Sequence, residues 1–255
     1  MPFTLAHPAA VLPLRRLPYL ATIPLILGSL TPDFVAYFPP TIHRSFDLPQ
    51  AHSVRGTILL DLPLGYAVLL ALLALRVPLT APLWEPHRSF IRAAITEFLA
   101  LKYWWLIALP SLLIGSWTHI VWDSFTHENR WVVRNLPLLQ QALAPVYDHP
   151  LPIYRVLQYV CSIVGLLIVA VWYGVALKQS GLSGTGHRWR KYTLAGLVAS
   201  AMVIGAADVW RLSPQLSLSF YGTMSVLLST AMAAFAALYL ITGIVIEINS
   251  NKRVT

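Results

Sequence analysis

Three side chains that can bind a metal ion recur at four-residue intervals within residues 115–127. They are His119, Asp123 and His127. In an α-helix this spacing places all three on one face, close enough for two of them to share an ion. The surrounding residues are mostly apolar, and a polar group without a partner is costly there. A divalent cation would satisfy these groups; the alternative is that they only form hydrogen bonds within a helix bundle.

The composition indicates an integral membrane protein. Of the 255 residues, 57% are hydrophobic and 11% are charged, whereas soluble domains carry about 25% charged residues. The formal net charge of +8 is typical of basic cytoplasmic loops, so we do not expect nucleic-acid binding. The single cysteine, Cys161, can form no intrachain disulfide and does not suggest a thiolate metal site. The opening lacks a basic region before its apolar stretch, so we expect no cleaved signal peptide.

Five apolar stretches approach the length of about 20 residues that crosses a bilayer as a helix. They cover residues 58–75, 103–121, 156–177, 192–209 and 222–246. A shorter stretch, residues 17–30, predicts a re-entrant or interfacial helix, with a further full span as the alternative. We therefore predict an all-α polytopic bundle of about five spans plus an N-terminal helical hairpin. Residues 1–150 would form the site-bearing region and residues 151–255 an apolar membrane anchor.

Basic residues in the connections predict an orientation. Lysine and arginine gather between residues 76 and 102, between residues 178 and 191, and at residues 252–253. By the positive-inside rule these regions are cytoplasmic. His52, His119 and Asp123 then emerge on the opposite, non-cytoplasmic side.

The N-terminal segment must bend if it is to supply ligands on that side. Asp33 follows a proline and can reach the outer face, although such an aspartate is often only a turn residue. A straight helix over residues 8–32 would be about 37 Å long and would place His7 across the membrane from Asp33. Pro13, Pro18 and Pro24 argue against a straight helix. A hinge near residues 15–18 would return His7 and Asp33 to one side.

Five motifs carry a resemblance to known proteins: residues 1–13, 28–33, 51–57, 61–65 and 115–127. Together they resemble an uncharacterised prokaryotic family of integral membrane proteins, a domain of unknown function. The order of the motifs is also similar to that of membrane-bound metal-dependent hydrolases and, more distantly, to zinc-dependent phospholipase C and nucleases. The resemblance implies a protein of the prokaryotic plasma (inner) membrane, surrounded by membrane lipids, and the loop charges predict a site on its non-cytoplasmic side.

The similarity to phospholipase C implies a set of metal ligands. In that group the ligands run His, Asp, His, then H-x-x-x-D, His and H-x-x-x-E, with the N-terminal amine added. The first six match, in order, His7, Asp33, His52, His119, Asp123 and His127. No H-x-x-x-E follows, because Asp148 and His149 are adjacent, and the Met1 amine precedes a proline. We therefore expect one or two metal ions.

The types of ligand favour zinc, with manganese or iron as alternatives, because imidazole and carboxylate occur here without thiolate. A catalytic ion of this kind keeps an open position for water and lowers the pKa of that water. Asp33 or Asp123 would then bridge two ions or act as general base.

Other polar residues are candidates for supporting roles. Arg44, Arg55 and Arg130 lie in the outer loops and could bind an anionic phosphate, although loop arginines usually contact lipid headgroups. Asp61 lies within a predicted span and must be satisfied by some partner. Asp61 and Glu128 are candidates to accept a hydrogen bond from the ring nitrogen of a metal-binding histidine that does not bind the metal itself.

The sequence supports three hypotheses of function. The first is a membrane-bound metal-dependent hydrolase that acts on a phosphoester of a lipid-like substrate. The second is a small transporter or channel with Asp61, Asp208 and Glu247 on an ion path, although Asp208 could instead pair with Arg211. The third is a metal-stabilised assembly protein without catalysis. Candidate ligands collect before residue 130 and the later spans are almost purely apolar, which favours hydrolysis over transport.

The orientation can be tested by labelling with a membrane-impermeant thiol reagent. A cysteine introduced at Ser45 or Asn129 should react from outside the cell, whereas a cysteine at Ser183 should not, because the positive-inside rule places it in the cytoplasm. The reverse pattern would place the site on the cytoplasmic side.

Overall fold

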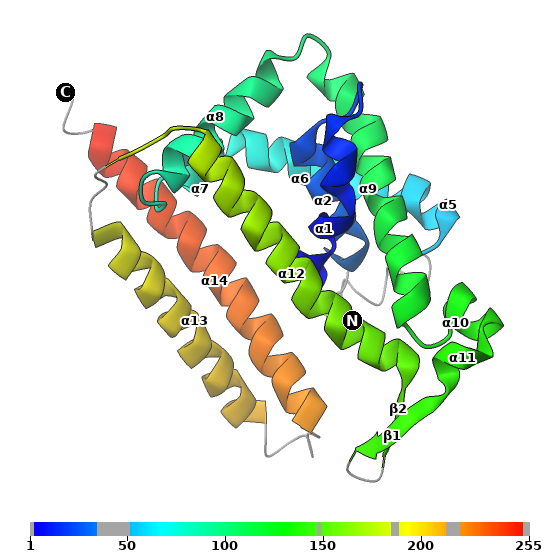
Figure 1. Cartoon of the computed structure of the whole chain (residues 1–255). Helices are drawn as coiled ribbons and strands as arrows, with labels where there is room; N and C mark the ends of the chain where they lie inside the picture. The colour runs from blue at the N-terminus through cyan, green and yellow to red at the C-terminus, as the bar shows by residue number, and fades with distance from the viewer. Residues whose placement is uncertain (1–2, 35–51, 147–148, 185–188, 213–219, 252–255) are drawn as a thin grey trace. The chain divides into compact units, whose positions relative to one another are not determined.

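The computed structural model is almost entirely helical (Figure 1). It describes residues 3–34, 52–146, 149–184, 189–212 and 220–251. Within these residues, five helical stretches are long and apolar enough to cross a membrane: Val54–Ala74, Trp104–Asn135, Ile153–Gln179, Trp189–Leu212 and Val226–Ser250. Each overlaps one predicted span. The predicted all-α bundle of about five spans is therefore confirmed.

The chain packs into two compact units, each built from two separate stretches. The first contains Met1–Leu70 and Glu97–Ala176, and the second contains Ala71–Thr96 and Leu177–Thr255. Every predicted metal ligand belongs to the first unit. Most of the span that follows residue 150 also packs with the first unit. The functional division at residue 150 stays a prediction, because packing alone does not test it.

The N-terminal segment forms the predicted hairpin. Its first arm consists of the short turns Thr4–Ala6, α1 (Pro8–Val11) and Pro13–Arg16, and its second arm is α2 (Thr22–Phe34).

The bend of this hairpin lies between Leu17 and Ala21. Leu17 is extended, with φ −71° and ψ 139°, and Tyr19 has a φ of +66°, so no helix continues through them. The arms fold back, and Thr4 Oγ1 donates a hydrogen bond to Asp33 Oδ2 at 2.6 Å. The two ends of the segment therefore meet.

Glycines bring α2 against α9 (Trp104–Thr126). A Cβ atom at Gly115 would lie 2.5 Å from the Leu25 carbonyl oxygen and 2.7 Å from the Ser29 nitrogen. A Cβ atom at Gly28 would overlap the backbone of Leu112. The two backbones thus lie in contact, an approach that small residues permit between membrane helices.

A proline inside α2 adds a polar link between the same helices. Pro32 has no N–H, so the carbonyl of Gly28, four residues earlier, lacks its usual helical partner. Ser116 on α9 donates its hydroxyl to this carbonyl at 3.2 Å. Since an unpaired carbonyl is costly in an apolar environment, this bond favours one register of α9 against α2.

The rest of the first unit consists of one further span and a compact region after α9. The span comprises α5 (Val54–Gly56), the π-helical segment Thr57–Asp61 and α6 (Leu62–Ala74), whose last residues belong to the second unit. The region after α9 contains α10 (Trp131–Asn135), α11 (Pro137–Gln140) and an antiparallel hairpin of β1 (Ala142–Val146) and β2 (His149–Pro152), which the sequence did not predict. Val133 of α10, Leu139 of α11 and Tyr154, at the start of the next helix, form a small apolar core.

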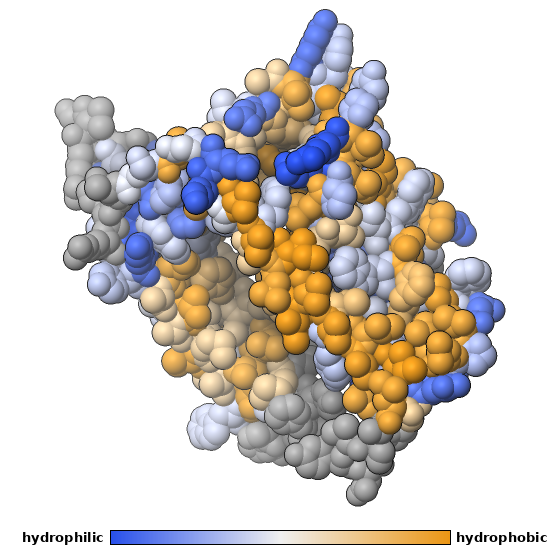
Figure 2. Space-filling view, viewed as in Figure 1, coloured by the Kyte–Doolittle hydropathy of each residue, from blue (hydrophilic) through white to orange (hydrophobic). Residues whose placement is uncertain are grey.

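Helix α12 (Ile153–Gln179) presents apolar side chains outward. Ile163, Leu167 and Val171 are 62%, 59% and 64% exposed, and their four-residue spacing places them on one face. Apolar residues also cover much of α12 in the view of Figure 2. A stripe of this kind on a long helix indicates contact with the hydrocarbon of a membrane.

The second unit contains α7 (Arg76–Thr80), most of α8 (His87–Ala100), α13 (Trp189–Leu212) and α14 (Phe220–Asn251). Asp208 on α13 pairs with Arg211 at 2.7 Å and accepts a hydrogen bond from Thr230 on α14 at 2.9 Å. The predicted pair of Asp208 and Arg211 is confirmed, and the hydrogen bond from Thr230 links the two helices.

Glycine packing between α2 and α9 can be tested with one alanine variant and a matched control. Gly28→Ala should lower the free energy of unfolding by about 1–3 kcal/mol, because its methyl group overlaps the backbone of α9. Gly174 on α12 has no neighbour within 4 Å of its Cβ position, so Gly174→Ala should leave stability unchanged or slightly raised. Thermal unfolding in detergent, followed by circular dichroism, measures both variants. An equal loss in the two would contradict close packing as the cause.

Candidate metal centre

Six side chains that the sequence predicted as metal ligands converge in the first unit. His7 precedes α1, Asp33 lies in the last turn of α2, His52 precedes α5, His119 and Asp123 lie on α9, and His127 follows it. The side chains of His7, Asp33, His119 and Asp123 are at most 5% exposed, and those of His52 and His127 are 10% and 19% exposed. Four separate segments thus meet at one buried point.

Four of these side chains form a first group of ligand atoms. His52 Nε2 lies 3.4 Å from Asp33 Oδ1 and 3.6 Å from Asp123 Oδ2. His119 Nε2 lies 3.6 Å and 3.3 Å from the same two oxygens. Atoms that bind a tetrahedral zinc ion at about 2.0–2.2 Å are separated from one another by about 3.3–3.6 Å. The four distances from imidazole nitrogen to carboxylate oxygen match this spacing, and Asp33, His52 and His119 each offer a ligand atom within 4.8 Å of the other two.

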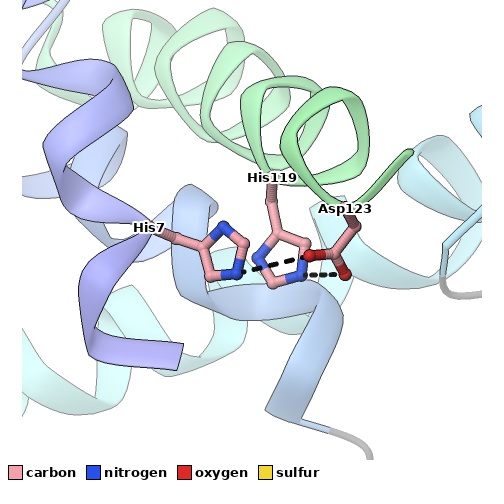
Figure 3. A group of neighbouring side chains, drawn as sticks. All are labelled: His7, His119 and Asp123. Atoms are coloured by element: carbon pink, nitrogen blue, oxygen red, sulfur yellow. Dashed lines mark ion pairs between the residues drawn. The ribbon is translucent and has the colours of Figure 1, made fainter. Parts of the chain in front are cut away.

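The other oxygen of Asp123 faces a second group. Asp123 Oδ1 lies 3.6 Å from His7 Nε2 and 3.3 Å from His127 Nδ1. Figure 3 shows the rings of His7 and His119 side by side, both directed at the carboxylate of Asp123. The Asp123 carboxylate consequently lies between two sets of imidazole nitrogens.

A backbone carbonyl orients His119. The Nδ1 atom of His119 lies 2.7 Å from the carbonyl oxygen of Ser29. A carbonyl only accepts hydrogen bonds, so Nδ1 carries a hydrogen and Nε2 is the ring nitrogen that faces the two carboxylates. The Nε2 atom has no hydrogen-bond partner among the described residues. This arrangement, with a carbonyl behind the ring, is common for histidines that bind metal.

Two of the candidate ligands outside the spans, His7 and Asp33, are in the protonation states that bind a cation. Burial, together with the neighbouring His119 ring, lowers the pKa of His7 to about 3, so this imidazole is neutral at pH 7. Burial alone would raise the pKa of Asp33, but the facing rings of His119 and His52 hold it well below its usual range. Neutral imidazole and ionised carboxylate are the forms that coordinate a divalent ion.

The predicted phosphate-binding arginines differ in position. Arg130 donates a hydrogen bond from its guanidinium group to the carbonyl of His52 at 3.4 Å, so its charge lies beside the centre. Arg55 is exposed at the start of its span. Arg44 lies outside the described residues.

The two predicted supporting carboxylates also differ. Asp61 ends the π-helical segment with 1% exposure, and neither of its oxygens has a hydrogen-bond partner in the described part of the chain. Its carboxyl group is close enough to His119 and Asp33 for an electrostatic interaction, so it lies near the centre. Glu128 is exposed, and the described structure shows no contact between its side chain and the ligands.

Sequence reasoning missed three features of the centre. Thr4 and Gln158 contact it through Asp33 and His127, with Gln158 Nε2 at 3.5 Å from His127 Nε2, and the Ser29 carbonyl orients His119. The proximity of Thr4 to His7 in sequence was the one available signal. The expectation that His127 continues the helical face is wrong, because α9 ends at Thr126 and His127 is extended (φ −122°, ψ 137°).

The sequence profile of a family described as a domain of unknown function, DUF4184, matches residues 1–248. The chain belongs to the DUF4184 family. The match includes all six candidate ligands and nearly all of both packing units, which confirms the predicted membership of an uncharacterised family. No curated protein and no solved structure matches this DUF4184 chain.

Metal content provides a direct test of the centre. The purified DUF4184 protein should hold about one or two equivalents of a transition metal, measured by inductively coupled plasma mass spectrometry. His119→Ala should lose most of it, because the change removes a ligand that faces both carboxylates. His87 packs against Trp84 in the second unit, so His87→Ala is the matched control and should retain the metal.

Metal-free wild-type protein would contradict this assignment, provided that the cells are metal-replete and no chelator is used in purification. Equal metal content in the His119→Ala and His87→Ala variants would also contradict it.

Proposed function

We propose that this protein is a membrane-bound metal-dependent hydrolase that cleaves a phosphoester with a metal-activated water. The observation that carries the proposal is the position of Asp123. Its two carboxylate oxygens face different imidazole nitrogens at 3.3–3.6 Å. A carboxylate with both oxygens engaged in this way is suited to bridge two cations.

Two overlapping groups of side chains would hold the ions, each with ligand atoms that lie within 4.8 Å of one another. Asp33, His52 and His119 form one group, and His7, His119 and Asp123 form the other, with His127 beside Asp123. Water would complete the coordination, as in catalytic zinc sites. Zinc is the metal we propose, with manganese or iron as alternatives.

Such a pair of ions supplies the chemistry of phosphoester hydrolysis. Bound cations lower the pKa of water towards neutrality and stabilise the charge that develops on the phosphoryl oxygens. The oxygen of water would bond to phosphorus as the water loses a proton, the bond from phosphorus to the ester oxygen would break, and the leaving alcohol would take up that proton. Asp123 would be the bridge, and Asp33, whose second oxygen is held by Thr4, would be a terminal ligand in a fixed orientation.

Two further observations favour hydrolysis over the other hypotheses. Arg130 brings a positive charge beside His52, which suits an anionic substrate. Asp208, one of the three residues expected on an ion path, instead forms an ion pair with Arg211 and accepts a hydrogen bond from Thr230, which argues against transport. The resemblance to metal-dependent hydrolases points the same way, and the charge pattern supports a site on the non-cytoplasmic side of the plasma membrane.

The catalytic proposal is tested by charge-removing variants assayed with bis-p-nitrophenyl phosphate in zinc-replete buffer. Asp123→Asn should lower kcat by at least about 100-fold, because a neutral amide is a poor bridging ligand. Arg130→Ala should mainly raise KM, because it removes binding energy for the anion but no metal. Asp208→Asn makes the same change in the second unit, which holds none of the candidate ligands, and serves as the control. It should change neither kcat nor KM by more than about twofold.

Unchanged activity in both Asp123→Asn and His119→Ala would show that the metal is not catalytic. If both variants unfold at lower temperature while the wild-type protein shows no phosphoesterase activity above background, the centre stabilises the structure instead.

A further inference from the structure

An apolar groove of about 680 Å³ lies in the first unit beside α9. Its walls include Ala10 near the N-terminus, Trp117, Val121 and Phe125 on α9, and Leu157 and Cys161 on α12. Its volume falls within the range of about 300–1,000 Å³ that is typical of sites for small molecules. The groove is therefore large enough for a ligand, and its lining suits hydrocarbon.

One wall of the groove is shared with the candidate metal centre. Trp122 lines the groove and its ring meets the ring of His7 edge-on, with 5.9 Å between centroids. Thr126 also lines the groove, and its hydroxyl oxygen lies 3.2 Å from Nδ1 of His127. A chain lying in the groove would thus have one end beside the second group of ligands.

We propose that the groove holds the hydrocarbon chain of a lipid phosphate whose anionic head lies at the metal centre. This inference rests on the proposed function and specifies its substrate class. The groove and such a ligand are complementary in polarity and charge. The apolar walls match the hydrocarbon chain, and the candidate metal ligands and the guanidinium group of Arg130 match the phosphate.

The exposure of the groove favours a lipid over a soluble substrate. Val121 and Phe125 are 60% and 45% exposed, so the groove opens sideways along a helix that is long and apolar enough to cross a membrane. Hydrocarbon chains are the solvent on that side of such a helix. A chain could therefore enter from the bilayer without crossing water.

Cys161, the single cysteine of the chain, reports whether the groove is occupied. The wild-type protein in phosphatidylcholine nanodiscs is treated with N-ethylmaleimide, and modification is followed by intact mass. Dodecyl phosphate should slow the modification at least about tenfold, because its chain covers the thiol, whereas butyl phosphate should slow it less than about twofold. Dodecanol, which lacks the phosphate, should protect clearly less than dodecyl phosphate. Equal protection by dodecanol and dodecyl phosphate, or no protection by either, overturns the proposal.

A groove-filling variant separates this proposal from the general one. Thr118 lines the groove, whereas Leu109 lies on the same helix outside it and is 37% exposed. Thr118→Phe should lower kcat/KM for dodecyl p-nitrophenyl phosphate at least about tenfold and spare bis-p-nitrophenyl phosphate, whereas Leu109→Phe should affect neither. If the protein holds metal and hydrolyses both compounds equally well in every variant, the hydrolase stands and the groove proposal fails. If dodecyl phosphate protects Cys161 while no metal is bound, the hydrolase fails, and so does the placement of the phosphate at a metal.

Discussion

The burial of two carboxylates among apolar helices is the constraint on which the first unit depends. The side chains of Asp33 and Asp123 are 2% and 5% exposed, and an ion taken out of water without compensation costs several kcal/mol. Compensation comes from imidazoles on segments far apart in the chain. The folded N-terminal hairpin, the start of the second span and the end of α9 must therefore meet at one point.

The contact of α2 with α9 makes that meeting possible. Ligand atoms must come within a few ångströms of each other, and side chains of Asp and His are too short to bridge widely spaced helices. Gly28 and Gly115 remove the side chains that would separate the backbones, and the Ser116 hydroxyl satisfies the carbonyl that Pro32 leaves without a partner. Packing and polar satisfaction thus act on the same pair of helices.

Much of this architecture is predictable from the sequence, and the reason lies in the membrane. Long apolar stretches predict the spans because only apolar side chains are stable in the hydrocarbon core of a bilayer. Prolines predict the bend because they interrupt helices. The convergence of His7 with Asp33 could be anticipated only through that bend. The hairpin of β1 and β2, the departure of His127 from the helix, and the contact of Gln158 with it could not be anticipated. The contact of His127 with Gln158 joins residues far apart in the chain, which a local sequence pattern does not reveal. The two strands are short and contain prolines, so they lack the alternation of apolar residues that predicts a strand.

The hydrogen bond between His119 and the carbonyl of Ser29 has an evolutionary consequence. Every amino acid offers the same carbonyl, so the chemical nature of the side chain at position 29 has no bearing on which nitrogen of His119 holds its proton. The volume at that position does matter, because Ser29 is fully buried where α2 touches Gly115. Substitution at position 29 is therefore limited by the space and the apolar surroundings of its side chain, whereas the main chain sets which nitrogen of His119 carries the hydrogen.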